Sequence, residues 1–353
     1  MKKLIIILLA IWLPTFAYAQ GCSEPEPDQK LKLFGYIQAQ YDWNTETGEN
    51  TFLWNRARVG ITGNIPYDFQ YYVVAELSPS FTGNPFLLDA FASYNRFKWF
   101  KVAAGQFKSP FTLELQTPCH KLLTIDRSHV VVELASPLRD MGVMLFGGND
   151  QTFVKYQLAI MNGTGIGNYE DKGGKDYVGR VVFRPLKDKN LLAVGGNFRY
   201  GTSAPSAEGV TKDDTRLRYG LEGIVKWHNL LVQGEYIFGK DEGSYLVGGG
   251  CGGPGEVVIG SKEREGWYVT AAYMTQWRVQ PVFKYEYYDS DIQETDAANQ
   301  FCYTTTFGIN YFFNDWTRLQ INYTTVNSTL DIHSQLGNLP YNNLLMIQLQ
   351  AEF

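Results

Sequence analysis

Charged residues, cysteine, histidine and long apolar runs are all scarce in this sequence. Charged residues make up 19% of the 353 residues, whereas soluble domains carry roughly 25%, so an ordinary soluble globule is a poor fit. The 36 acidic residues outnumber the 31 Lys and Arg residues, for a formal net charge of -5, which excludes a basic nucleic-acid scaffold. After the N-terminal segment, no stretch reaches the roughly 18 apolar residues of a membrane-spanning helix.

The N-terminus has the pattern of an export signal. Lys2 and Lys3 precede an apolar run over 4–12, and the tripeptide over 17–19 is Ala-Tyr-Ala, a small-residue cleavage site. The apolar run is too short to span about 30 Å of hydrocarbon. The sequence therefore predicts a signal peptide over 1–19 and a short periplasmic N-terminal segment over 20–30. An exported chain of this kind is periplasmic, secreted or an outer-membrane barrel.

After that segment, apolar and polar residues alternate with a period of two. Over 31–43, Ile37 and Trp43 alternate with Gln38 and Asp42, so the two sets lie on opposite faces of a strand. Aromatic residues are 15% of the chain, and many lie near the ends of apolar faces, which is typical of the girdles of a lipid-facing barrel wall. The segments run about ten to thirteen residues, longer than soluble strands, and this favours a membrane barrel over a soluble sandwich.

About sixteen such segments can be counted, an even number as in single-chain bacterial barrels. Their expected bounds are 31–43, 52–65, 66–78, 86–97, 98–107, 139–147, 152–162, 177–184, 189–201, 215–228, 229–239, 264–275, 276–288, 301–313, 315–327 and 341–353. Short turns alternate with longer polar loops, the asymmetry expected of outer-membrane barrels. The last segment ends on Phe353, which resembles the terminal signal read by outer-membrane assembly machinery. The expected fold class is all-β: a transmembrane antiparallel β-barrel over 31–353 in the bacterial outer membrane.

The largest connection, residues 108–138, is rich in apolar residues such as Phe111, Leu122 and Ile125. Loops beyond roughly 15 residues in a compact domain are usually functional or disordered, and this one is too apolar for disorder. Sixteen strands leave an aqueous interior, so we expect this long third loop to fold into the lumen and narrow it. An apolar outer lid or a protein-docking surface is the alternative.

Several stretches carry a family resemblance. The sequence GQFKSPF over 105–111 is followed by Asp126-Arg127-Ser128 and by RDMGV over 139–143. Other matching stretches are 55–58, 176–181, 266–269, 281–289 and 318–323. Together they resemble the phosphate-selective porin O/P family over nearly the whole chain after the signal. The resemblance implies a sixteen-stranded anion channel with a basic constriction, typically a homotrimer, with small inorganic anions and outer-membrane lipid as its partners.

The candidate anion-binding residues are cationic side chains that either alternate into the lumen or lie in the third loop. They are Arg56, Arg58, Lys108, Lys121, Arg127, Arg139, Arg180, Arg218, Lys284 and Arg318. Arg stays protonated and its planar fork suits oxyanions, and rings of charge set the selectivity of channels. Luminal acids, Glu76, Glu222 and Glu286 among them, oppose these cations. We therefore expect an outer-membrane porin for passive diffusion of small anions, with phosphate as a candidate solute.

Two other functions fit the same barrel: a non-selective general diffusion porin, and a structural barrel that acts as a partner or anchor in an envelope assembly. An enzyme is not expected, because the nearest catalytic constellation, His333 with Asp331 and Ser334, lies on one loop. No catalytic residue, metal-ligand set, cofactor or nucleic-acid partner is predicted.

The four cysteines lie in a chain expected to reach an oxidising compartment, which favours disulfides. Cys251 and Cys302 fall on the same side of the predicted barrel, and we expect a bond between them. Cys22 and Cys119 have no obvious mates.

Overall fold

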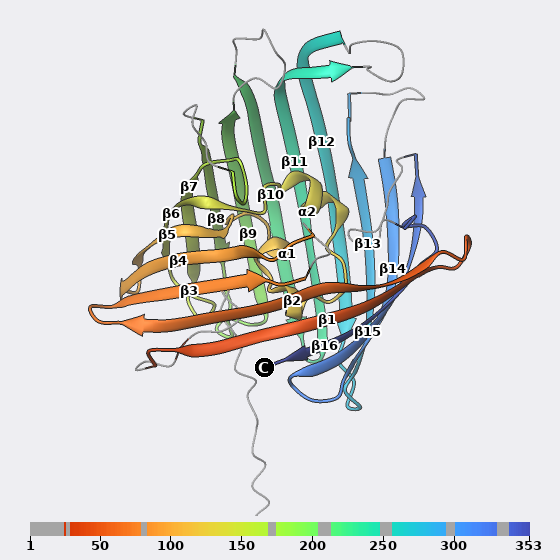
Figure 1. The fold of residues 1–353 in the computed structure, drawn as a ribbon, viewed down its shortest axis with the longest axis horizontal. Helices are drawn as coiled ribbons and strands as arrows, with labels where there is room; N and C mark the ends of the chain where they lie inside the picture. Colours follow the sequence, from red (N-terminus) through yellow and green to blue (C-terminus); the bar gives the residue numbers. More distant parts are fainter. Residues whose placement is uncertain are drawn as a thin grey trace, which may run out of the picture.

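Sixteen antiparallel strands close into one ring, in which each strand pairs with its neighbours in the sequence and β1 pairs with β16 (Figure 1). This computed structural model describes residue 25 and residues 29–78, 83–168, 174–203, 213–247, 256–293, 301–329 and 339–353. The expected signal peptide, Cys22, Cys251 and His333 lie outside the described residues. The predicted sixteen-stranded barrel is confirmed.

The strands follow the predicted segments closely. The first eight are β1 Lys32–Asn44, β2 Asn50–Ile65, β3 Phe69–Glu76, β4 Phe86–Phe97, β5 Phe100–Lys108, β6 Arg139–Gly147, β7 Val154–Met161 and β8 Asp176–Phe183. The second eight are β9 Leu192–Ser203, β10 Asp214–Trp227, β11 Leu230–Val247, β12 Glu256–Tyr273, β13 Val279–Asp289, β14 Phe301–Phe312, β15 Thr317–Ser328 and β16 Leu344–Glu352.

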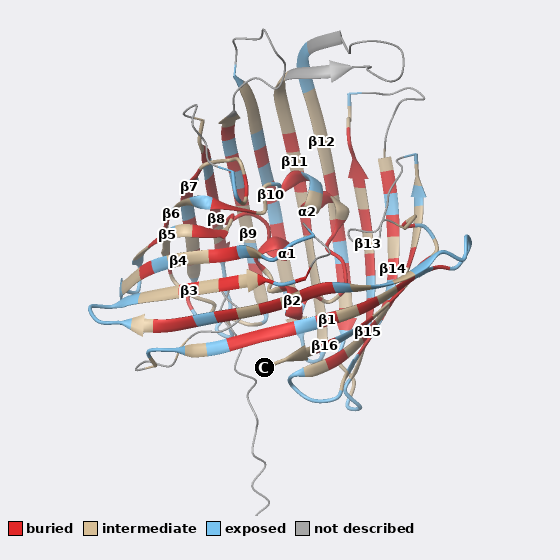
Figure 2. Cartoon of the chain, in the orientation of Figure 1, coloured by how far each residue is buried: buried red, intermediate tan, exposed pale blue. Residues whose placement is uncertain are grey.

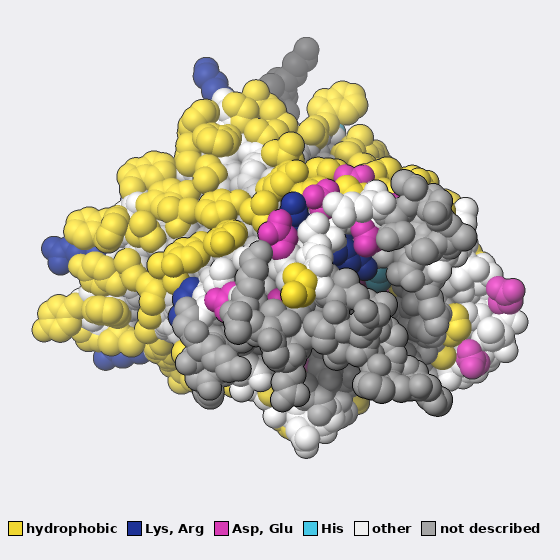
Figure 3. Space-filling model, turned by 90° about the horizontal axis from the view of Figure 1, so that it is seen from above, with side chains coloured by type: hydrophobic (Ala, Val, Ile, Leu, Met, Phe, Trp, Pro, Cys, Tyr) yellow, Lys and Arg dark blue, Asp and Glu magenta, His cyan; other side chains and the backbone are white. Residues whose placement is uncertain are grey.

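The alternation in the sequence becomes an outer and an inner face of the barrel. In β1, Ile37 is 43% exposed on the outer face, whereas its neighbour Gln38 is fully buried on the inner face. The same banding runs along strand after strand in Figure 2. Seen from above, hydrophobic side chains cover much of the outer wall (Figure 3). Apolar side chains outside and polar ones inside are the arrangement of a barrel whose wall contacts lipid.

One prediction about this barrel is wrong. The chain over 240–263 was expected to be a long loop, but β11 continues to Val247 and β12 begins at Glu256. The two strands remain paired throughout, from Leu230 with Tyr273 to Val247 with Glu256. Backbone hydrogen bonds hold this pairing, and they require no alternation of side chains.

Two β-bulges turn extra side chains toward the lumen. In β2 the register against β1 shifts so that Asn55 is an extra residue, and both Asn55 and Arg56 are buried. In β4 the register against β3 shifts at Leu88, and both Leu88 and Asp89 are buried. A bulge re-aims a side chain in this way because the strand gains one residue without gaining a partner.

The helices lie in the connection between β5 and β6, which the structure limits to residues 109–138 and which we call the third loop. They are α1 Leu113–Gln116, the 3₁₀ helix η1 Cys119–Lys121 and α2 His129–Leu134. Figure 1 shows α1 and α2 within the ring of strands. In the described part of the chain, no helix is both long and apolar enough to cross a membrane.

Candidate functional site

The first half of the third loop is fixed to the wall through α1. The carboxylate of Glu235 in β11 accepts hydrogen bonds of 2.7 Å from the backbone N–H groups of Leu113 and Glu114, and a third of 2.5 Å from the Tyr268 hydroxyl. The N–H groups in the first turn of a helix have no partners within the helix. Glu235 supplies those partners, so α1 is tied to β11 and β12.

The second half of the loop packs α2 against the inner face of β11–β13. Val130, Val131 and Leu134 are buried in one apolar cluster with wall residues such as Ile237 and Tyr288. The wall opposite α2 carries two glycines that allow a close approach. A Cβ added at Gly266 would lie 2.9 Å from the Cβ of Val130, and one added at Gly239 would lie 3.0 Å from Leu134. Larger residues at these positions would therefore push α2 off the wall.

The chain between α1 and α2 bonds to the other side of the ring. Arg318 in β15 donates to the Leu122 carbonyl at 2.9 Å, and Gln350 in β16 donates to the His120 carbonyl at 3.1 Å. Asn310 in β14 donates to the Leu123 carbonyl at 2.9 Å. The third loop is thus joined by hydrogen bonds to strands from β11 to β16.

The wall around β1, β2 and β16 carries a network of amide side chains. Gln38 donates to Gln350 at 2.7 Å, and Asn55 donates to both Gln40 and Gln348 at 2.7 Å. These side chains are buried. Amides both donate and accept, so they satisfy one another in the lumen without any net charge.

Five of the ten predicted anion-binding residues form ion pairs with carboxylates of the wall or of the third loop. The pairs are Arg58 with Glu76 at 2.7 Å, Arg139 with Asp89 at 2.9 Å, Arg180 with Glu222 at 2.6 Å, Arg218 with Asp241 at 2.7 Å, and Lys284 with Glu286 at 3.2 Å and Glu114 at 3.6 Å. All five cations are buried. Their charges are therefore largely compensated within the protein. Alternation alone could not predict this, because it shows on which face of the barrel wall a residue lies but not which residue it pairs with.

Four of the other five donate hydrogen bonds to side-chain amide or backbone carbonyl oxygens. Arg56 donates to Gln38 at 2.8 Å, and Lys108 donates to the carbonyls of Leu115 and Thr117 at 3.2 and 3.3 Å. Arg127 donates to the same Thr117 carbonyl at 3.3 Å, and Arg318 donates to Gln350 as well as to Leu122. Lys121 is the fifth, and its side chain is exposed at the end of η1.

Cys119 lies among several of these cations. Nη1 of Arg58 is 3.1 Å from its Sγ, and Nη2 of Arg127 is 3.3 Å away. Burial raises the pKa of the Cys119 thiol, but the nearby cations outweigh burial and hold the pKa well below its usual value. Those cations are Arg127, Arg58, Arg56 and Lys108. The field around η1 is therefore strongly positive.

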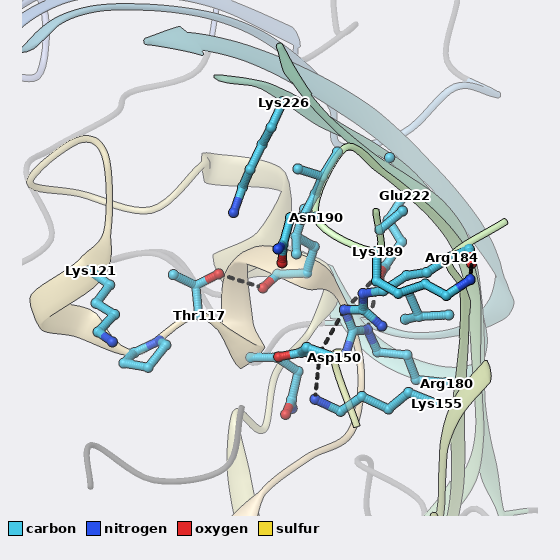
Figure 4. Close-up of a pocket in the computed structure, with 17 residues that line it drawn as sticks. Thr117, Lys121, Asp150, Lys155, Arg180, Arg184, Lys189, Asn190, Glu222 and Lys226 are labelled. Atoms are coloured by element: carbon cyan, nitrogen blue, oxygen red, sulfur yellow. Dashed lines mark hydrogen bonds and ion pairs between the residues drawn. The ribbon is translucent and has the colours of Figure 1, made fainter. Parts of the chain in front are cut away.

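Two cavities flank η1, and Lys121 lines both. One, of about 230 Å³, lies between the third loop and the wall of β7–β10 (Figure 4). The other, of about 450 Å³, lies toward β13–β16 and is lined by amides, one Arg and two carboxylates. The first cavity, which we call the cationic cavity, is lined by six cations and two carboxylates. They are Lys121, Lys155, Arg180, Arg184, Lys189 and Lys226, with Asp150 and Glu222.

The sequence-based choice of site residues included only Lys121 and Arg180 of the cationic cavity. Asp150 and Lys189 lie in the turns after β6 and β8, and Lys226 lies near the end of β10. Alternation assigns no face to the turn residues Asp150 and Lys189, so these two were missed, whereas Lys226 lies on an alternating strand and was not chosen. The available signal was the concentration of charge in the two turns over 148–153 and 184–191, where Asp150, Arg184 and Lys189 fall.

The structure does not show Cys302 in the disulfide that was expected between it and Cys251. This residue is a free, buried cysteine in the structure, while Cys251 lies outside the described residues. Cys302 belongs to the apolar cluster that includes Val130 and Tyr288. Its thiol therefore packs beneath α2 rather than facing an outer loop. Among the described residues, no group of His, Cys, Asp and Glu side chains is arranged to hold a metal ion.

The barrel resembles solved porin structures over most of its length. An anion-selective porin from Comamonas acidovorans shares 12% identity, with a TM-score of 0.67 over 92% of this chain and 100% of the other. The trimer form of OmpT from Vibrio cholerae shares 13% identity, with a TM-score of 0.64 over 92% and 99%. The outer membrane channel DcaP of Acinetobacter baumannii shares 12%, with a TM-score of 0.64 over 92% and 97%. At these identities the likeness establishes the fold, which is that of an outer-membrane porin.

The family follows from the sequence. Residues 34–223 match the family described as phosphate-selective porin O and P, and this match spans more than half of the chain. The chain belongs to that family, as the resemblance in its sequence implied. No curated protein matches it. Family and fold together define a channel of the bacterial outer membrane.

Proposed function

We propose that this porin conducts small anions, including phosphate, by passive diffusion through the space beside the third loop. The observation that carries the proposal is the cationic cavity, where six cations face two carboxylates and leave an excess of four positive charges. Cationic linings favour anions in channels. Arg180 and Arg184 add the planar donor geometry that suits an oxyanion.

The ion pairs of the lumen support a channel that is selective without binding its solute tightly. Arg180 is paired with Glu222, and Arg218 is paired with Asp241. Conduction requires sites that attract an ion and still release it. Partly compensated cations meet this requirement better than bare ones.

The assembly and processing of the chain are part of the same proposal. We infer a signal peptide over 1–19, a periplasmic segment over 20–30 and a homotrimer. The trimer rests on the family resemblance and on the trimer form recorded for the Vibrio cholerae OmpT structure.

A structural barrel with little transport is the second candidate, and one observation favours it. Buried luminal side chains occur all round the ring, from Gln38 in β1 through Arg199 in β9 to Gln348 in β16, and the third loop bonds to several of these strands. A loop attached on so many sides could close the lumen.

Planar-bilayer recording separates the two candidates. The purified barrel is expected to conduct, and the potential between chloride on one side and phosphate on the other reports whether phosphate is favoured. A barrel that inserts but carries no current would overturn the channel and leave the structural anchor.

A further inference from the structure

We propose that the second cavity beside η1 is a binding site for an uncharged, polyhydroxylated solute, such as a mono- or disaccharide. This cavity, which we call the neutral cavity, is lined by Gln280, Phe312, Trp316 and Glu352 among others. Its volume of about 450 Å³ falls within the range of about 300–1,000 Å³ that is usual for small-molecule sites. The inference goes beyond the passage of anions and does not depend on it.

The neutral cavity has no formal excess of charge, in contrast to the cationic cavity. Lys121 and Arg318 are balanced by Asp315 and Glu352. The imidazole of His120 adds no charge at neutral pH, because burial and repulsion from Lys121 lower its pKa to about 3. Since no net charge attracts an ion, a solute here must be held by hydrogen bonds and apolar contact.

The guanidinium group in this cavity is already occupied by the protein. Nε and Nη2 of Arg318 donate to the side-chain oxygen of Gln350 at 3.2 and 3.1 Å, and Nη1 donates to the Leu122 carbonyl at 2.9 Å. Arg318 is 5% exposed. An anion would therefore find no open guanidinium fork, and it would meet the carboxylates of Asp315 and Glu352. These contacts disfavour a second anion site.

Two amide side chains leave their NH₂ groups available as donors. Oε1 of Gln280 accepts from Asn310 at 3.0 Å. Oδ1 of Asn314 accepts from the backbone N–H groups of Trp316 and Thr317 at 2.8 Å. Among the described residues, neither Nε2 of Gln280 nor Nδ2 of Asn314 donates a hydrogen bond. Each NH₂ group carries two donors, so the oxygen atoms of solute hydroxyl groups find donors here.

The two carboxylates of the neutral cavity supply acceptors. Oε1 of Glu352 accepts from Gln350 at 2.7 Å, whereas Oε2 lies 4.0 Å from Nε2 of His120, beyond the reach of a hydrogen bond. Asp315 is exposed in the turn between β14 and β15, and it accepts no hydrogen bond from the part of the chain that is described. A hydroxyl group both donates and accepts, so it can use the amides and the carboxylates together.

Two aromatic side chains give the cavity an apolar surface. Phe312 is the last residue of β14 and is partly buried, and Trp316 is 59% exposed directly before β15. An aromatic lining with a few polar groups is typical of sites for organic ligands. A sugar ring has C–H faces that pack on aromatic rings and hydroxyl edges that bond to polar groups, so its chemistry matches both parts of this lining.

The first test measures how maltose blocks the KCl current of the barrel in planar bilayers. Gln280→Met removes an amide donor of the neutral cavity. Its matched control is Gln233→Met, which lies on the same face of β11 as Glu235 and outside the lining of both cavities. Gln280→Met is expected to raise the maltose concentration that halves the current by about fivefold, because a hydrogen bond is lost. Gln233→Met should stay within about twofold of wild type.

A second pair of variants tests the aromatic surface. Trp316→Leu removes a ring from the lining, and Trp277→Leu removes an 80% exposed tryptophan from the turn between β12 and β13, outside the lining. Tryptophan also anchors barrels at the membrane interface, and a role in anchoring alone would affect both variants alike. Trp316→Leu is expected to weaken the block by maltose about tenfold, and Trp277→Leu is expected to leave it within about twofold.

A further readout separates sugar binding from transport. Saturation-transfer NMR of maltose, with the barrel in a detergent that has no sugar headgroup, reports binding alone, and heat-modifiable mobility on SDS gels reports folding. Maltose binding that is weakened in Gln280→Met and Trp316→Leu and kept in the two controls supports the sugar site. It does so even if the barrel shows no anion preference, a result that would count only against the proposed function.

Three results would overturn the sugar site, even in an anion-selective channel. The first is that folded wild type binds no maltose. The second is that each site variant binds maltose as its matched control does. The third is that glycine or tetramethylammonium binds more tightly than maltose, because the cavity would then select a zwitterion or an organic cation.

Discussion

Cationic side chains in this lumen differ mainly in what compensates their charge. Arg180 and Arg139 each have a carboxylate partner below 3 Å, whereas Lys121 is exposed and lines both cavities. Reversing a paired arginine would break a buried ion pair, which is strongly destabilising. Lys121 is therefore the better probe of selectivity.

Lys121→Glu is expected to shift the reversal potential of the channel toward cations, because two charge units change beside the path of the ion. The measurement is zero-current potential in a KCl gradient. Lys187→Glu, in an exposed periplasmic turn outside the cavity lining, provides the control and should cause a much smaller shift. Equal shifts in the two variants would mean that general surface charge, and not the site at η1, controls selectivity.

His120 predicts a pH dependence of stability. Burial, followed by repulsion from Lys121, lowers its pKa to about 3, against roughly 6.5 in an unfolded chain. Between these values the unfolded chain binds a proton that the folded chain does not. The free energy of unfolding contributed by this group therefore falls as pH drops below about 6.5, by at most about 1.4 kcal/mol per pH unit.

His120→Gln should remove this part of the acid sensitivity. Urea unfolding of the detergent-solubilised barrel at pH 7 and pH 5 measures it, because the midpoint tracks the free energy of unfolding. His228→Asn, in an exposed turn where His228 has a φ of 52°, should leave the wild-type slope intact. A His120→Gln barrel that loses as much stability as wild type between the two pH values would contradict the buried, neutral imidazole.

The face of each luminal residue was predictable from the sequence, but its partner was not. Period-two alternation placed Arg58 and Glu76 inside the barrel, and the structure confirms that both are buried. Their ion pair depends on the register of β2 against β3, which aligns the two residues directly. Register is fixed by pairing across strands, and a single sequence gives no such information at this distance.

At the scale of elements, the third loop depends on the wall as much as on its own sequence. The helix α1 has four residues, far fewer than an isolated helix needs in water. Its first N–H groups are held by Glu235. Strand β11 therefore stabilises this helix from outside.

Glu235→Ala is expected to loosen α1 and to lower the free energy of unfolding by about 3 kcal/mol, because two buried N–H groups lose their hydrogen-bond acceptor. Limited proteolysis within 109–138 and urea unfolding measure the two effects. Glu242→Ala removes a carboxylate that pairs with Lys240 at the exposed end of the same strand, and such a pair contributes at most about 1 kcal/mol. Similar losses in both variants would show that Glu235 does not anchor the loop.

The hairpin of β11 and β12 shows where sequence-based bounds fail. Alternation is lost after residue 239 because Lys240, Asp241 and Glu242 are consecutive charged residues. The paired strands nevertheless continue to Val247. The hydrophobic pattern marks the part of a strand that contacts lipid. The pattern therefore stops where β11 and β12 leave the membrane, although the two strands continue beyond that point.

At the scale of the whole molecule, the number of strands and their closure were predictable because the membrane imposes both. Unpaired backbone groups are not tolerated in hydrocarbon, so every strand needs two neighbours. The pairing of β1 with β16 gives these two strands their second neighbours and closes the ring, with residue pairs from Tyr36 with Glu352 to Asn44 with Leu344. The path of the third loop is not imposed by the membrane. It follows from particular contacts such as Arg318 with Leu122, and these required the structure.

The central claim is that the positive excess beside the third loop makes this barrel an anion channel. The most direct measurement is the reversal potential of the purified wild-type barrel in a planar bilayer under a KCl gradient. We expect a potential displaced toward the chloride equilibrium value. A potential at the potassium value, or no current through correctly folded and inserted barrels, would contradict it.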